Sequence, residues 1–189
     1  MEFRKATVEN YGEIRDFYDY VIDHTENMQT CARWKKGLHP SDAAIREYLE
    51  TGCMYILTDG AVILGAMAVT MRQGEDYHSI AWETDAKDED AAVLHILAAN
   101  PDYHGKGIGR KMVAEAIDLA KEQGKTVFRL DALASNIPAR RMYASLGFRL
   151  MGKRNLYADN TGWTDFFFYE YPLDEKSPSA SEIQARKSG

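Results

Sequence analysis

The sequence predicts an α/β (α+β) fold, a single domain in which helices flank a central mixed sheet. Strand-like apolar runs alternate with helix-like runs whose apolar residues recur every three or four positions. The dipeptide Asp59-Gly60, which favours tight hairpins, separates two of the strand-like runs. Two further strand-like runs follow one another at the C-terminal end, as an antiparallel pair would. These three observations together favour a sheet that is not wholly parallel.

The N-terminal quarter of the chain is expected to supply one strand and two helices. Glu2–Ala6 is strand-like, and Thr7 is placed to cap a helix over Val8–Ile22. Ser41 is placed to cap a second helix that runs through Leu49. The first helix buries one face, because its apolar residues recur at helical spacing: Ile14, Phe17, Tyr18 and Val21.

The remaining elements follow in an order that alternates strands and helices. Strands are expected at Met54–Leu57 and Val62–Met71, followed by an acidic connection over residues 73–90. After it we expect a central strand at Val93–Ala99, a helix at Arg110–Glu122, a strand at Thr126–Ala132, a helix at Pro138–Leu146, and paired strands at Phe148–Tyr157 and Trp163–Tyr171.

The loop between the central strand and its helix reads His104-Gly105-Lys106-Gly107-Ile108-Gly109. Three glycines in five positions allow backbone N–H groups to gather around an anion at the positive end of the helix. The spacing fits neither the dinucleotide fingerprint nor the P-loop, because Arg110 and Lys111 follow with no Ser or Thr. The sequence therefore indicates a pyrophosphate-binding loop, with a plain strand-to-helix turn as the alternative.

A second motif carries a family resemblance. Asn136, Ala139, Tyr143, Gly147 and Phe148 follow the pattern N-x-x-A-x-x-x-Y-x-x-x-G-F. Together with the glycine loop, this segment resembles the GNAT family of acetyl-CoA-dependent N-acetyltransferases, whose other signature is Q/R-x-x-G-x-G/A. The resemblance extends over residues 2–172, with one departure, since a histidine begins the glycine loop where the family has Gln or Arg.

The resemblance implies a GNAT fold, with a mostly antiparallel sheet of about seven strands that splays between the fourth and fifth. It also implies acetyl-CoA as co-substrate, no metal, and transfer of the acetyl group to a primary amine of a small molecule or a peptide. The residues implied in cofactor binding are Leu97, Ala98, Ala99, His104, Gly105, Lys106, Gly107, Ile108, Gly109, Arg110, Asn136 and Tyr143.

Acetyl transfer needs a neutral amine and an acid for the departing thiolate. Asn136 and Tyr143 are two helical turns apart and share a helix face, which lines the cofactor in relatives, with the tyrosine near the sulfur. Tyr143 is therefore the predicted acid, and a core tyrosine is the alternative. Neither Cys31 nor Cys53 lies in the motifs, which favours direct transfer over a covalent intermediate.

The general base is less clearly marked. Histone-type relatives have a Glu at the position of Val93, and His95 lies two residues further on the same strand face. His95 is therefore the predicted base, with a buried core histidine as the alternative. Asp131 occupies the position of an acid that acts as base in some relatives modifying ribosomal protein N-termini, with an ordinary surface aspartate as the alternative. Glu83 is a third candidate if the strand after Gln73 extends that far.

The acceptor site is predicted from two segments. In the family, the connection between the first two helices covers the acceptor, and here it contains Trp34, which either walls the pocket or packs beneath the loop. Glu83 begins an acidic run that could attract a cationic amine, although a solvated loop would have the same composition. A catalytically silent acyl-CoA-binding or sensing module is the rival interpretation of the whole chain.

Length and composition agree with one enzyme domain. The domain is expected to span residues 1–173 of 189, with a flexible tail at 174–189. No apolar stretch approaches the ~20 residues of a membrane span and no signal peptide is recognisable, so a cytoplasmic location is expected. The net charge of −6 disfavours nucleic acid, and the two cysteines lack metal-site spacing. The oligomeric state stays open, a homodimer included.

Overall fold

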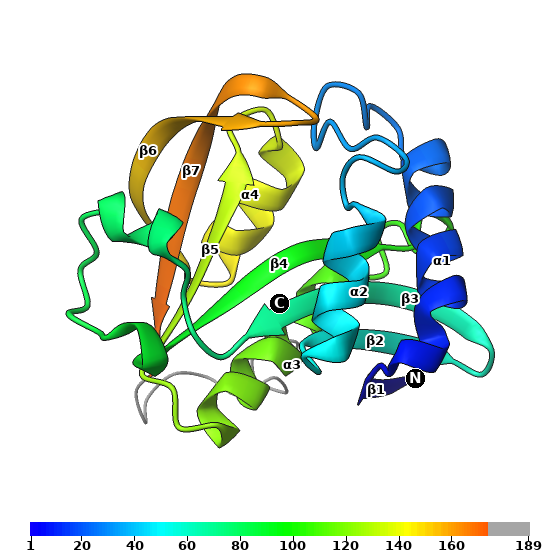
Figure 1. The fold of residues 1–189 in the computed structure, drawn as a ribbon, viewed down its shortest axis with the longest axis horizontal. Coiled ribbons are helices and arrows are strands. Elements are labelled where there is room, and N and C mark those ends of the chain that lie inside the picture. The colour runs from blue at the N-terminus through cyan, green and yellow to red at the C-terminus, as the bar shows by residue number, and fades with distance from the viewer. Residues whose placement is uncertain (174–189) are drawn as a thin grey trace.

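The computed structural model describes residues 1–173, so the expected tail at 174–189 lies outside the described residues. Seven strands form one sheet in the order β1-β2-β3-β4-β5-β7-β6. Every neighbouring pair is antiparallel except β4 and β5, which run parallel. The predicted mixed, mostly antiparallel sheet flanked by helices is therefore confirmed (Figure 1).

Element boundaries lie close to those predicted. Two differ for local reasons: the helix after the glycine loop begins at Ile108 because Gly107 is its N-cap, and the acidic connection ends in a short turn that starts β4 at Ala91. The helices are α1 (Tyr11–His24), α2 (Asp42–Glu50), α3 (Ile108–Glu122) and α4 (Ile137–Ser145), and the strands are β1 (Glu2–Lys5), β2 (Met54–Asp59), β3 (Val62–Thr70), β4 (Ala91–Ala99), β5 (Val127–Leu133), β6 (Arg149–Ala158) and β7 (Gly162–Pro172).

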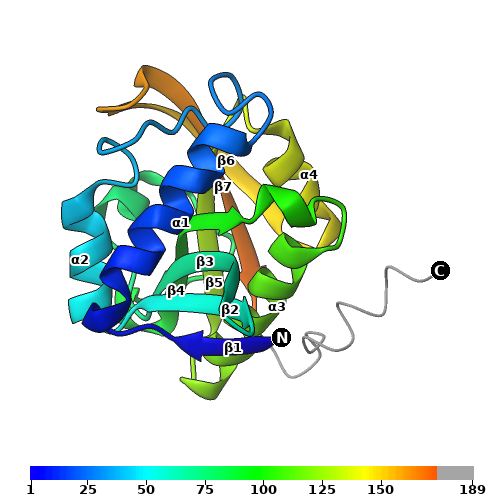
Figure 2. The same ribbon diagram turned by 90° about the vertical axis from the view of Figure 1, so that its right-hand side faces the viewer.

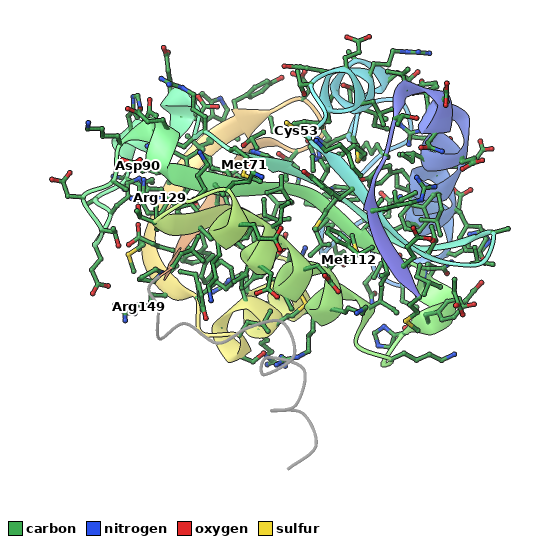
Figure 3. The ribbon with its side chains drawn as sticks, turned by 90° about the horizontal axis from the view of Figure 1, so that it is seen from below. Cys53, Met71, Asp90, Met112, Arg129 and Arg149 are labelled. Atoms are coloured by element: carbon green, nitrogen blue, oxygen red, sulfur yellow. The ribbon has the colours of Figure 1, made fainter. Side chains whose placement is uncertain are left out.

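The helices cover the sheet in two layers. Helices α1 and α2 pack on one face and α3 and α4 on the other, as Figure 2 shows. Met112 of α3 is fully buried against the sheet (Figure 3), and Ile14 of α1 and Ile45 of α2 are fully buried on the opposite side. Burial of such apolar side chains stabilises the fold by about 1.5–3 kcal/mol each.

Strands β4 and β5 pair only along the first half of β4. Their registered partners run from Ala91–Leu94 to Val127–Leu130, and no pairing follows. Directly after this segment Ile96 has a φ of +45°, and the pairing of β4 with β3 shifts register opposite it. Tyr18 Oη donates to the Ile96 carbonyl at 2.9 Å and holds this bulge, whose backbone strain costs on the order of 1–3 kcal/mol. The two strands therefore separate where the sequence predicted the splay.

The acidic connection does not extend β3. Residues 75–79 and 88–90 form short 3-10 turns instead. Glu83 lies on a shallow depression beside Arg129, outside the opening between β4 and β5, and its Oε1 pairs with Arg149 Nη1 at 2.6 Å. Both side chains are more than half exposed. Glu83 therefore does not line the opening between β4 and β5, because the strand that would carry it there does not form.

A buried ion pair ties this connection to the sheet. Arg129 of β5 and Glu170 of β7 are each 1% exposed, with Arg129 Nε 2.9 Å from Glu170 Oε2. The remaining guanidinium N–H groups donate to Gln73 Oε1 at 2.5 Å and to the Thr84 carbonyl at 2.8 Å. The indole of Trp82 lies 4.2 Å from the guanidinium carbon. Each polar atom of the pair thus has a partner, as burial of charge requires.

Glu170→Ala is expected to lower the free energy of unfolding by about 3–5 kcal/mol, because it leaves the Arg129 cation buried and unpaired. Urea denaturation measures this loss. Lys153→Ala, which removes an exposed ion pair with Asp165, is the control and should cost less than about 1 kcal/mol. Equal losses for the two variants would show that the buried pair contributes no more than a surface pair.

Candidate active site

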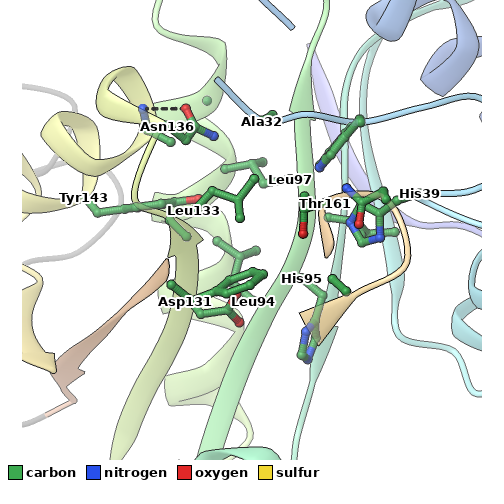
Figure 4. Close-up of a pocket in the computed structure, with 18 of the residues that line it drawn as sticks. Ala32, His39, Leu94, His95, Leu97, Asp131, Leu133, Asn136, Tyr143 and Thr161 are labelled. Carbon is green, nitrogen blue, oxygen red and sulfur yellow. Dashed lines mark hydrogen bonds between the residues drawn. The ribbon is translucent and has the colours of Figure 1, made fainter. Parts of the chain in front are cut away.

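The opening between β4 and β5 forms a cleft of about 360 Å³. Its walls come from the separated strands, from α4, from the connection between α1 and α2, and from the tip of the β6–β7 hairpin (Figure 4). The lining residues include Trp34, His95, Leu97, Asp131, Asn136 and Tyr143.

The glycine loop meets this cleft at the N-terminus of α3. Gly105 and Gly107 have φ angles of +76° and +78°, a region that side-chain-bearing residues avoid. The first backbone bond of the helix runs from Lys111 N–H to the Gly107 carbonyl at 3.0 Å. Within the described residues, the N–H groups of Ile108, Gly109 and Arg110 therefore have no acceptor, and Gly109 lines the cleft. This end of α3 suits an anion.

The charged side chains around the loop lie beside the cleft rather than in it. Lys106 Nζ sits 4.6 Å above the Tyr103 ring, and Arg110 Nη1 donates to Ser145 Oγ at 2.6 Å. His104 is exposed at the start of the loop. Arg140 Nη1 donates to the Ala134 carbonyl at 2.8 Å. The hydrogen-bond donors that the fold holds in place for an anion are therefore backbone N–H groups.

The end of β4 forms part of the cleft wall. Leu97 and Ala99 line it, whereas Ala98 is buried in the cluster around α1 and α2. Across the cleft, Asn136 caps α4, and its Oδ1 accepts from Ala139 N–H at 3.3 Å. The side-chain amide N–H groups of Asn136 have no acceptor among the described residues and lie at the cleft wall (Figure 4). The two walls together offer hydrogen-bonding groups to an extended ligand.

Tyr143 enters the cleft from α4. Its ring is 6% exposed and packs near Phe148 and Tyr169. Its hydroxyl points toward the cleft and has no hydrogen-bond partner in the part of the chain that the structure describes (Figure 4). Burial, and after it the charge of Asp131, raises the pKa of Tyr143 well above its ordinary value. The hydroxyl is therefore held protonated.

His95 and Asp131 line the cleft from the face of the sheet opposite to α4. Val93 and Arg129 are registered partners, so His95 and Asp131, each two residues further along, project from the same face. The His95 Nε2 lies 3.1 Å from Thr70 Oγ1. This geometry brings together the predicted base and its closest alternative.

The two groups differ in proton affinity. Burial lowers the pKa of His95 to about 4. Burial raises the pKa of Asp131, and the hydrogen bond that its Oδ1 accepts from Tyr77 Oη at 2.7 Å offsets only part of this rise. A general base works best with a pKa near the working pH. Burial shifts the pKa of His95 away from neutral pH and that of Asp131 toward it, so the direction of the shift favours Asp131.

Trp34 lines the cleft and also packs against the apolar cluster around α1 and α2. Its indole lies 5.9 Å from the Tyr18 ring and 5.6 Å from the His39 ring. No local pattern in the sequence marks His39, Tyr48 or the hairpin tip at residues 158–161, all of which reach the cleft through long-range packing.

The splayed parallel strands, the helix N-terminus and the buried tyrosine are the features that the family resemblance led us to expect. The chain belongs to the Acetyltransferase (GNAT) family, whose family model matches residues 14–148. The predicted family is thereby confirmed.

Curated relatives match only part of the chain. The L-amino acid N-acyltransferase MnaT of Escherichia coli is 33% identical over 86 residues, which is 45% of this chain and 50% of that protein. The ribosomal protein bS18-alanine N-acetyltransferase of Escherichia coli is 34% identical over 85 residues, or 44% of this chain and 57% of that protein. The chain thus spans about half the length of the curated relatives it matches.

Solved structures share the fold over nearly the whole chain. An acetyltransferase of the GNAT family from Streptococcus agalactiae has a TM-score of 0.73 at 17% identity, covering 92% of this chain and 96% of that one. The yncA protein of Salmonella typhimurium, solved with its cofactor acetyl-CoA, has a TM-score of 0.65 at 20% identity, covering 94% and 96%.

No cluster of three or more His, Cys, Asp or Glu side chains in residues 1–173 could hold a metal ion. None of the helices there combines the length and apolar character needed to cross a membrane.

Proposed function

We propose that the protein is an acetyl-CoA-dependent N-acetyltransferase that acetylates a primary amine by direct transfer. The observation that carries the proposal is the cleft between β4 and β5, which joins an unpaired helix N-terminus to a buried, protonated tyrosine. Acetyl-CoA would supply the acetyl group as a reactive thioester. The N–H groups at the start of α3, the end of β4 and the Asn136 amide would bind it.

Proton movements in the proposed reaction fall to two side chains, one from α4 and one from β5. Tyr143 donates its hydroxyl proton to the departing sulfur, and its high pKa makes it an acid that is fully protonated at neutral pH. Asp131 accepts the proton of the attacking amine at Oδ2, because Oδ1 is already hydrogen-bonded to Tyr77. His95, with its lowered pKa, is then an uncharged wall of the acceptor site.

Asp131→Asn and His95→Gln separate the two candidate bases. If Asp131 is the base, its variant loses most of the rate, and the parent rate falls as pH drops through a pKa raised above the ordinary 3.8. If His95 is the base, the His95→Gln variant loses most of the rate, and the parent rate falls on the acidic side near pH 4. Rates of both variants on one amine across pH decide between them. If both variants keep the pH–rate profile of the parent protein, the attacking amine loses its proton to solvent.

The proposed activity is tested by screening primary amines for release of free CoA from acetyl-CoA. Calorimetry of acetyl-CoA binding is run beside it, because the rival interpretation is a catalytically silent acyl-CoA-binding module. Release of CoA that depends on an amine supports the enzyme. Tight binding of acetyl-CoA with no release for any amine would favour the silent module. A cytoplasmic location stays a prediction, which cell fractionation can test.

A further inference from the structure

The part of the cleft that is proposed to hold the amine, called the acceptor half, has an aromatic wall. Trp34 and His39 lie edge to face at 5.6 Å, and the rings of Tyr48 and His95 stack at 5.7 Å. Phe166 of β7 completes the wall. Rings arranged in this way favour an aromatic or apolar ligand body, which they can pack against face or edge.

The wall carries no charge at neutral pH. Burial lowers the pKa of His39 and that of His95, so both imidazoles are neutral. Burial raises the pKa of Tyr48 to about 12, which keeps its hydroxyl protonated. A polar ligand group that entered this half would therefore meet hydrogen-bonding partners but no counter-ion.

Among the described residues, no Lys or Arg side chain lines the cleft, and Asp131 is its one carboxyl group. Arg33 lies on the neighbouring segment, but its guanidinium is held by the Thr161 carbonyl at 2.9 Å and by Thr164 Oγ1 at 3.3 Å. A free amino acid has its carboxylate one carbon from the reacting nitrogen. Placing that nitrogen beside Asp131 would bury the carboxylate next to another acid with no cation to pair it.

The walls of the acceptor half are joined to each other. Asn160 Nδ2 of the hairpin tip donates to the Arg33 carbonyl at 3.0 Å, and Ser135 Oγ donates to the Cys31 carbonyl at 2.8 Å. Figure 1 shows the connection after α1 reaching the tip of the β6–β7 hairpin. This closure favours a compact acceptor over an amine attached to a folded protein.

From these observations, and resting on the proposed function, we infer that the acceptor is a small primary amine with an aromatic or apolar body and no neighbouring carboxylate. The inferred class differs from that in the name of MnaT, an L-amino acid N-acyltransferase. It also excludes polyamines as preferred acceptors, because each further ammonium group would need a carboxylate that the described cleft lacks.

Three acceptors that share one ring and chain test the inference: phenethylamine, L-phenylalaninamide and L-phenylalanine. The full chain is assayed with acetyl-CoA, and kcat/KM is corrected for the neutral fraction of each amine. Phenethylamine is expected to exceed L-phenylalanine by at least about 100-fold. L-phenylalaninamide, which has the bulk of the acid without its charge, should fall much nearer to phenethylamine. Spermidine and a peptide with N-terminal alanine should be poorer than phenethylamine.

A variant pair tests the cause of the discrimination. Thr161→Lys adds a cation to the lining and should reduce the preference for phenethylamine over L-phenylalanine by about 10-fold. Thr161→Met, of similar length and no charge, should leave the preference unchanged. L-phenylalanine, spermidine or the peptide as the best acceptor would overturn the inference and leave the proposed function intact. No CoA release with any acceptor, despite acetyl-CoA binding by calorimetry, would overturn both.

Discussion

Tyr143→Phe is expected to lower turnover by about 10²-fold while acetyl-CoA affinity stays within a few-fold of the parent value. The substitution removes only the hydroxyl, which faces the cleft, and keeps the ring that packs near Phe148 and Tyr169. Steady-state CoA release and calorimetry measure the two quantities. Because burial keeps the pKa of Tyr143 well above its ordinary value, the parent rate should also show no decline at mildly alkaline pH.

Tyr157→Phe is the matched control, since it removes a tyrosine hydroxyl from the exposed face of β6 and should leave turnover unchanged. If Tyr143→Phe acetylates the best amine at the parent rate, the tyrosine is a packing residue and the proton for the leaving sulfur comes from another group. That result would leave the binding of acetyl-CoA untouched and would remove the acid from the proposed reaction.

Gly107→Glu is expected to weaken acetyl-CoA binding by at least about 100-fold, because it places a carboxylate at the anion-binding end of α3. The backbone there has a φ of +78°, so any side chain also adds strain. Gly124→Glu controls for this strain, since Gly124 has a φ of +68° just beyond the other end of the same helix. Both variants should lose about 1–2 kcal/mol of stability, and only the first should lose the cofactor.

Calorimetry on the two folded variants checks this prediction, with circular dichroism to confirm that each retains its secondary structure. Equal acetyl-CoA affinity in Gly107→Glu and Gly124→Glu would mean that the glycine loop is a structural turn, which is the alternative that the sequence left open. It would also require the pyrophosphate to bind elsewhere on the protein.

Local spacing explains what the sequence could predict. The glycine loop and the helix from Asn136 to Tyr143 are each contained in one short segment, so their geometry follows from residue type and helical period. The splay was predictable only through the family resemblance. Its physical cause, the bulge at Ile96 held by Tyr18, joins residues that are 78 positions apart in the sequence.

Long-range packing explains what the sequence could not predict. Arg129 is a charged residue in an apolar strand, and nothing local shows that Glu170 will neutralise it 41 positions later. The same connection that this pair anchors brings Tyr77 to Asp131 and turns Glu83 away from the cleft. The proton affinities of the candidate bases depend on that burial, so residue type alone ranked His95 above Asp131.

A single turnover measures the central claim most directly. Protein in excess is mixed with acetyl-CoA carrying a labelled acetyl group and with phenethylamine, and mass spectra of the protein and of the amine are recorded over time. The account predicts that the label passes to the amine with no acetylated protein at any time point. Label that accumulates on the protein first would contradict direct transfer. Label that stays on CoA in the presence of every amine of the screen would contradict the proposed activity itself.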